Sequence, residues 1–152
     1  MEKFRGGLLV ADLDQSQTHS TVTSPLARIL KTLFGLFFVA AGGNHFLNES
    51  FYLRMMPPYL PWHEALVVLS GLAEMALGAL LLIPRTSRWG AWGLVVLLIA
   101  VFPANLQMAL HPETFPEFNP MSLWARLPLQ LLLIAWASWY TRQPAYSSQP
   151  HP

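Results

Sequence analysis

Residues 63–83 read HEALVVLSGLAEMALGALLLI, and after the opening turn they contain one charged side chain, Glu74. A helix of this length, at about 1.5 Å per residue, matches the ~30 Å hydrocarbon core of a bilayer. The segment is therefore typical of a transmembrane helix.

Three further apolar segments of similar length lie at residues 26–46, 89–110 and 123–140. Prolines stand near segment ends, where helices tolerate them: Pro25, Pro61, Pro84 and Pro112. Pro103 and Pro128 lie inside segments and predict kinks. None of the segments alternates apolar with polar residues as a membrane β-strand does. The sequence therefore predicts an all-α fold, an integral membrane four-helix bundle.

The composition agrees with lipid as the solvent. Hydrophobic residues make up 53% of the 152 residues and charged residues only 11%, against roughly 25% charged in soluble domains. A net charge of +1 without a basic run does not fit a nucleic-acid binder. The chain has no cysteine, which excludes disulfides, Fe–S clusters and thiol exchange within it.

The domain organisation follows from these segments. Residues 1–24 are expected to form a disordered or surface-lying tail, residues 25–142 the transmembrane domain, and residues 143–152 a flexible tail. Basic residues gather on one side of the predicted bundle: Lys3, Arg5, Arg28, Lys31, Arg85, Arg88 and Arg142. The positive-inside rule then predicts that both termini are cytoplasmic and that residues 47–62 and 111–122 face outward.

The first outer connection is unusually apolar. Its residues 51–62 are rich in aromatic, Met and Pro side chains, and so many prolines argue against a helix. We expect this segment to lie over the outer end of the bundle. It is either a membrane-hugging connector or a lid over a cavity, in which Tyr52, Pro58, Tyr59 and Trp62 would take part.

Polar side chains inside the spans are the candidates for function. They fall in the predicted outer half and come from all four helices: His45, Ser70, Glu74, Asn105, Arg126 and Gln130. We expect Glu74 and Arg126 to be coupled, directly as an ion pair or through Gln130, because each charge alone is costly in lipid. Two interpretations stay open, namely structural hydrogen bonding between helices and a pocket for a polar head group.

Metal and haem sites are not expected. His45, His63 and His111 all fall at helix ends and show no paired spacing. His63 and Glu64 instead suit the start of the second span. The glycine pairs Gly35 with Gly43 and Gly71 with Gly78 each recur on one helix face, which predicts close helix packing.

The ordered set of short motifs resembles the DoxX or DoxX-like family. The motifs are GNHF at 43–46, PPYLP at 57–61, SGLAE at 70–74, FPAN at 102–105 and WARLPLQ at 124–130. The resemblance covers about residues 26–140. It implies a small four-helix protein of the bacterial inner (plasma) membrane with a link to quinone chemistry. It matches His45, Pro58, Glu74, Asn105, Arg126 and Gln130 to the family's polar pattern.

The leading functional hypothesis is an accessory membrane component that binds a quinone- or lipid-like molecule in an outer-half pocket. One alternative is a subunit of a quinone-linked oxidoreductase whose redox centre sits on a partner, and another is a scaffold or assembly factor. A catalytic activity of the chain alone is not expected, nor is an intrinsic cofactor, and quinone is the candidate ligand. The candidate partners are the lipid bilayer, a membrane redox protein and a second copy of the chain, but not nucleic acid.

Overall fold

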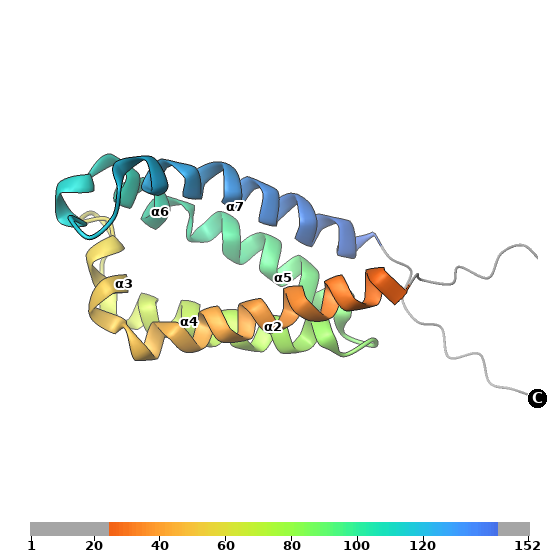
Figure 1. Cartoon of the computed structure of the whole chain (residues 1–152). Helices are drawn as coiled ribbons and strands as arrows, with labels where there is room; N and C mark the ends of the chain where they lie inside the picture. Colours follow the sequence, from red (N-terminus) through yellow and green to blue (C-terminus); the bar gives the residue numbers. More distant parts are fainter. Residues whose placement is uncertain (1–24, 143–152) are drawn as a thin grey trace, which may run out of the picture.

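The structure, a computed structural model, describes residues 25–142, and the tails expected at 1–24 and 143–152 lie outside them. In the described part, four long helical stretches run along the bundle (Figure 1). They are α2 (Pro25–Leu47), α4 (His63–Leu82), the consecutive pair α5 (Ser87–Ala100) and α6 (Phe102–Leu110), and α7 (Pro120–Thr141). Two short elements, α3 (Glu49–Met55) and the 3-10 helix η1 (Pro112–Thr114), lie in the connections. The predicted all-α four-helix bundle is confirmed.

These four stretches, counted within the described residues, are 20 to 24 residues long and are apolar enough to span a membrane. At about 1.5 Å per residue, each is long enough to cross a bilayer. Large apolar side chains are exposed on their outer faces, including Leu36 on α2, Leu69 on α4 and Val96 on α5. Exposed apolar surface on this scale is suited to lipid contact. The chain is therefore a multi-pass membrane protein.

The helices pack in sequence order: α2 against α4, α4 against α5, and α5 against α7. In Figure 1, α3 lies at one end of the bundle, whereas the start of α2 and the end of α7 lie at the other. We call these the α3 end and the terminal end. In the terminal half, the Phe34 ring of α2 reaches α7, with centroid distances of 4.6 Å to Trp136 and 5.9 Å to Tyr140.

A seam of glycines lets α2 and α4 approach closely. A Cβ atom at Gly42 would lie 2.5 Å from the carbonyl oxygen of Gly71, and one at Gly78 would lie 2.7 Å from that of Gly35. The predicted packing role therefore holds for Gly35, Gly71 and Gly78. It is wrong for Gly43, since a Cβ there would meet no described atom within 4 Å. Gly42 belongs to the seam because it lies two turns after Gly35 on the same face.

The third span is broken at Val101, between α5 and α6. Pro103 has no N–H, so the carbonyl group of Ile99, four residues earlier, loses its helical donor. The irregularity expected near Pro103 is thus a break two residues before the proline. Pro128 lies inside α7, which stays one helix from Pro120 to Thr141.

The connection between α2 and α4 contains a helix where none was expected. Residues 51–55 belong to α3, so the expectation of a helix-free segment over 51–62 is wrong for its first part. The three prolines of the segment, Pro57, Pro58 and Pro61, all follow α3. They therefore end the helix without interrupting it.

Arg54 holds α3 against the connection that precedes α7. It donates from Nη1 to the carbonyl oxygen of Thr114 at 3.0 Å and from Nη2 to Oε1 of Glu117 at 2.5 Å. Its guanidinium carbon also lies 5.1 Å from the ring centroid of Phe115. We call these contacts the α3 clasp. Beside it lies a buried apolar cluster of Met55, Met108, Phe115 and Leu123.

Candidate functional site

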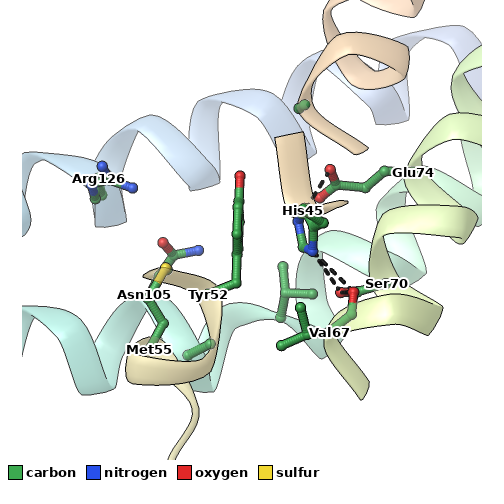
Figure 2. A pocket seen from close by; sticks show the side chains of 11 residues that line it. His45, Tyr52, Met55, Val67, Ser70, Glu74, Asn105 and Arg126 are labelled. Carbon is green, nitrogen blue, oxygen red and sulfur yellow. Dashed lines mark hydrogen bonds and ion pairs between the residues drawn. The ribbon is translucent and has the colours of Figure 1, made fainter. Parts of the chain in front are cut away.

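A cavity of about 140 Å³ lies at the α3 end of the bundle. Figure 2 shows the side chains around it. Five of the six predicted binding residues line the cavity: His45, Ser70, Glu74, Asn105 and Arg126. Its other lining residues are Ala41, Tyr52, Met55, Val67, Val101 and Ala104. The sequence-based hypothesis of a shared polar pocket thus has a geometric counterpart.

His45 is fixed against α4 near the end of α2. Its Nδ1 lies 3.1 Å from the carbonyl oxygen of Val67 and 3.3 Å from Oγ of Ser70. A carbonyl oxygen can only accept, so we assign the ring hydrogen to Nδ1. Gly71 permits the approach, because a Cβ there would lie 2.7 Å from Cβ of His45. The imidazole is therefore held with its Nε2 atom directed toward Glu74.

Glu74 carries a buried oxygen without a hydrogen-bond partner. The residue is only 9% exposed. Its Oε2 atom lies 3.7 Å from Nε2 of His45, which is too long for a hydrogen bond. Within the described residues, this Oε2 atom has no other partner. An unsatisfied buried acceptor costs roughly 1–3 kcal/mol, and more when it is charged. It is therefore available to a donor that enters the cavity.

Tyr52 extends from α3 into the site. Its ring stacks on His45, with centroids 3.7 Å apart and planes 24° apart. Its hydroxyl group accepts a hydrogen bond from Nδ2 of Asn44 at 3.0 Å. Burial raises the pKa of the Tyr52 phenol above its ordinary value, and the hydrogen bond from Asn44 opposes this shift. The phenol therefore stays protonated at neutral pH and keeps a hydrogen to donate.

The expected direct ion pair between Glu74 and Arg126 is wrong, and so is the link through Gln130, whose partners are Asn105 and Leu98. Both residues line the cavity, but no ion pair joins them in the part of the chain that the structure describes. The guanidinium carbon of Arg126 lies 5.5 Å from the ring centroid of Phe118 instead. In Figure 2, Tyr52 stands between Arg126 and the side of the cavity that holds Glu74. The aromatic ring therefore takes the space in which the two charges would meet.

Gln130, the sixth predicted binding residue, is not among the lining residues. It is 3% exposed, and its Nε2 donates to the carbonyl oxygen of Leu98 at 2.7 Å. Its Oε1 accepts from Nδ2 of Asn105 at 3.3 Å. Leu98 lies just before the break at Val101, where regular helical hydrogen bonding ends. Gln130 therefore stabilises the broken span, and this contact still leaves Asn105 a second N–H hydrogen.

Of the residues expected to form a lid, Tyr52 lines the cavity and three do not: Pro58, Tyr59 and Trp62. Tyr59 is 71% exposed and Trp62 is 81% exposed. Pro58 is exposed as well, so these three side chains face away from the cavity. The cover is instead formed by α3 itself, through Tyr52 and Met55.

The small and apolar residues that line the cavity were not predicted from the sequence. Ala41 lies one turn before His45, and Val101 lies one turn before Asn105, so each shares a face with a predicted residue. This spacing could have identified both. The role of Asn44 as the partner of Tyr52 could not be found in this way, because the two residues belong to different helices.

The site is suited to hydrogen bonding and apolar contact. Among residues 25–142, no group of three His, Asp or Glu side chains is placed to hold a metal ion. The cavity offers an unpaired acceptor in Glu74 and donors in Arg126 and Asn105. Most of the rest of its wall is apolar. Such a site suits a small head group that carries both a donor and an acceptor.

Fold and site together define a small multi-pass membrane protein with a partly polar cavity at one end of its bundle. The chain belongs to a family described as "Domain of unknown function (DUF8561)", whose model matches residues 34–141. The matched segment includes every residue that lines the cavity. No curated protein and no solved structure matches the chain.

Proposed function

We propose that this chain is an accessory membrane protein that binds the head of a quinone- or lipid-like molecule in the cavity at the α3 end. One observation supports this above all. Glu74 has a buried oxygen without a partner, and Arg126 has no counter-ion among the described residues, yet both line one cavity. Polar side chains that served only to join helices would pair with each other, because unpaired groups are costly in lipid.

The size of the cavity limits what it can hold. Its volume of about 140 Å³ is close to the roughly 150 Å³ of an engineered cavity that binds benzene. It therefore accommodates one six-membered ring or a head of similar size. Pockets for whole drug-sized ligands measure roughly 300–1,000 Å³, so the rest of a longer molecule must extend among the lipid chains. An amphiphile with a compact head meets both conditions.

The wall provides matching chemistry for such a head. A ring carbonyl would accept hydrogen bonds from Arg126 or Asn105, and a ring hydroxyl would donate to Glu74. The apolar side chains of Val67, Val101 and Ala104 provide contact for the ring faces. A quinone and its reduced form offer these carbonyl and hydroxyl groups, and a glycerol-based lipid head offers hydroxyl and ester groups.

We place the protein in the bacterial inner membrane, with the α3 end outward and both termini cytoplasmic. The excess of Lys and Arg on the terminal side supports this orientation. The DoxX-like motifs support both the location and the link to quinones. Because the chain has no cysteine, Glu113→Cys should react with an impermeant maleimide in cells with a permeabilised outer membrane. Arg85→Cys, exposed at the other end, should not react, and its labelling would reverse the orientation.

Thermal unfolding in mild detergent tests binding directly. Ubiquinone, menaquinone and phospholipid analogues are added one at a time, and mass spectrometry identifies molecules that co-purify. A ligand at about 100 times its Kd would stabilise the folded state by about 2.7 kcal/mol. Ala41→Leu should fill the cavity and abolish the shift without removing a polar group. Gly43→Leu, on the same helix but facing open space, should leave the shift intact.

Absence of a shift with all three classes would contradict the proposed function and favour the scaffold alternative. An equal shift in Ala41→Leu would place binding outside the cavity. If quinone is turned over only when a second membrane protein co-purifies, the oxidoreductase-subunit alternative would be favoured instead.

A further inference from the structure

The ring of Tyr52 already has the surroundings that a bound ring would need. One face stacks on His45 at a centroid distance of 3.7 Å, and its oxygen accepts a hydrogen bond from Asn44. Figure 2 shows the ring between Arg126 on one side and His45 and Glu74 on the other. The most complete set of ring-binding contacts in this cavity is thus occupied by a side chain of the protein itself.

Tyr52 projects into the cavity between the side that holds Arg126 and the side that holds Glu74. A ring lying on the Arg126 side of Tyr52 is separated from the unpaired oxygen of Glu74, and it cannot stack on His45. Removing the phenol would widen the space between the two sides. One ligand could then donate to Glu74 and accept from Arg126, which satisfies both groups at once.

The element that carries Tyr52 is a short helix in the connection between two spans. α3 has seven residues, and a helix that short is not stable on its own in water. It is held by the α3 clasp, which is partly exposed to solvent, and by the cluster around Met55. Segments with few buried contacts open at low free-energy cost compared with long packed helices. Withdrawal of α3 would carry Tyr52 out of the site.

We propose that Tyr52 is a built-in occupant of the ligand site and that the ligand is a planar, oxygen-substituted six-membered ring, phenolic or quinoid, which displaces it. This inference rests on the proposed function and narrows it from amphiphiles in general to ring-headed ones. A phosphate head fits less well, because the unpaired carboxyl group of Glu74 shares the cavity and would repel it. In this arrangement His45 stacks on the ligand ring, and Asn44 donates to its oxygen.

The change in ligand affinity on removing the Tyr52 ring shows whether Tyr52 occupies the ligand site or forms part of its wall. An occupant competes with the ligand, so Tyr52→Ala should bind the ring more tightly than the wild type. A stacking wall would contribute to binding, so the same substitution should weaken it. The expected gain is about tenfold in Kd, which corresponds to about 1.4 kcal/mol.

Calorimetric titration in detergent with ubiquinone carrying one isoprene unit measures this difference. Tyr59→Ala is the matched control, because Tyr59 follows on the same connection and does not line the cavity. In Tyr52→Ala, p-cresol should compete with the quinone, since it replaces the missing side-chain ring. Tyr52→Leu serves as the second variant if Tyr52→Ala does not fold.

The outcomes separate the two proposals. Tighter binding in the Tyr52 variant alone, with competition by p-cresol, supports the built-in occupant. Equal or weaker binding than in the wild type and Tyr59→Ala overturns it and leaves the proposed function standing. A quinone that binds to none of the folded proteins overturns the proposed function itself.

Discussion

The terminal half and the α3 half of the bundle are built from the same four spans but are packed in different ways. The terminal half is filled by apolar side chains from each of α2, α4, α5 and α7, among them Phe34, Phe38, Leu81, Leu94, Ala137 and Tyr140. The α3 half encloses a cavity with polar side chains on its wall, including Glu74 and Arg126. The glycine contact between Gly35 and Gly78 lies in the first half, and the break at Val101 lies in the second.

The difference in packing suggests that the terminal half mainly stabilises the fold and that the α3 half mainly binds a ligand. In the terminal half, apolar side chains fill the space between the helices, so little room is left there for another molecule. In the α3 half, some polar groups find partners, as Gln130 does, whereas Glu74 does not. Changes in the first half should therefore act on folding, and changes in the second should shift the balance between folding and ligand binding.

The largest expected effect comes from Gly78→Leu in the terminal half. Its Cβ would lie 2.7 Å from the carbonyl oxygen of Gly35 and 3.0 Å from the backbone nitrogen of Val39. Backbone atoms cannot move aside unless α2 and α4 separate, so we expect a loss of about 3 kcal/mol or more. The yield of monodisperse protein and its thermal midpoint measure the loss. Gly43→Leu is the control, and equal stability of the two variants would disprove the close contact.

The sequence was sufficient to predict those features of the two halves that depend on composition and on helical periodicity. The spans follow from apolar length, and the shared face of Ser70 and Glu74 follows from their spacing of four residues. The same spacing led to a wrong prediction for Arg126 and Gln130, because only Arg126 lines the cavity. They share a face of α7, yet Gln130 turns to the Leu98 carbonyl group exposed by the break in the neighbouring span.

What the sequence did not predict depends on contacts between elements. α3 is too short to show a helical period, so its ring at Tyr52 could not be placed between the two charges. The predicted Glu74–Arg126 pair rested on the cost of isolated charges alone. That argument holds only when no other group takes the space between the charges, and here an aromatic ring takes it.

Gln130→Leu should have the next largest effect. It removes the donor to the Leu98 carbonyl oxygen and the acceptor for Asn105. A buried carbonyl group left without a partner costs roughly 1–3 kcal/mol, so the thermal midpoint should fall. Leu129→Ala, next to it and 53% exposed, should change the midpoint much less. A Gln130→Leu variant as stable as the wild type would show that the broken span needs no such support.

Glu74→Met should raise the stability of the ligand-free protein, whereas the preceding substitutions lower it. It removes the unpartnered buried oxygen and keeps a side chain of similar length, so the ligand-free protein should gain about 1–2 kcal/mol. The response to quinone should disappear at the same time. In a double-mutant cycle with Arg126→Met, the two effects should add within about 0.5 kcal/mol, because the residues are not paired. A coupling above 1 kcal/mol would restore the predicted ion pair.

The smallest effect is expected at the α3 clasp. The hydrogen bond from Arg54 lowers the pKa of Glu117 below its ordinary value. A lowered folded-state pKa means that the stabilisation is present above the unfolded pKa and is lost as the pH falls through the folded one. The clasp should therefore be intact at pH 6 and weaken below about pH 4. Since both side chains are partly exposed, added salt should weaken it as well.

Hydrogen exchange in residues 49–55, corrected for intrinsic rates, measures the clasp without requiring global unfolding. Glu117→Gln should raise exchange in α3 at pH 6 and remove most of its pH dependence, while the thermal midpoint changes little. Glu113→Gln is the matched control, because it removes one carboxylate from the same connection, but its partner is His111. Faster exchange in both variants would point to the charge of the connection as a whole. Unchanged exchange in Glu117→Gln would mean that the apolar cluster around Met55 alone holds α3 over the cavity.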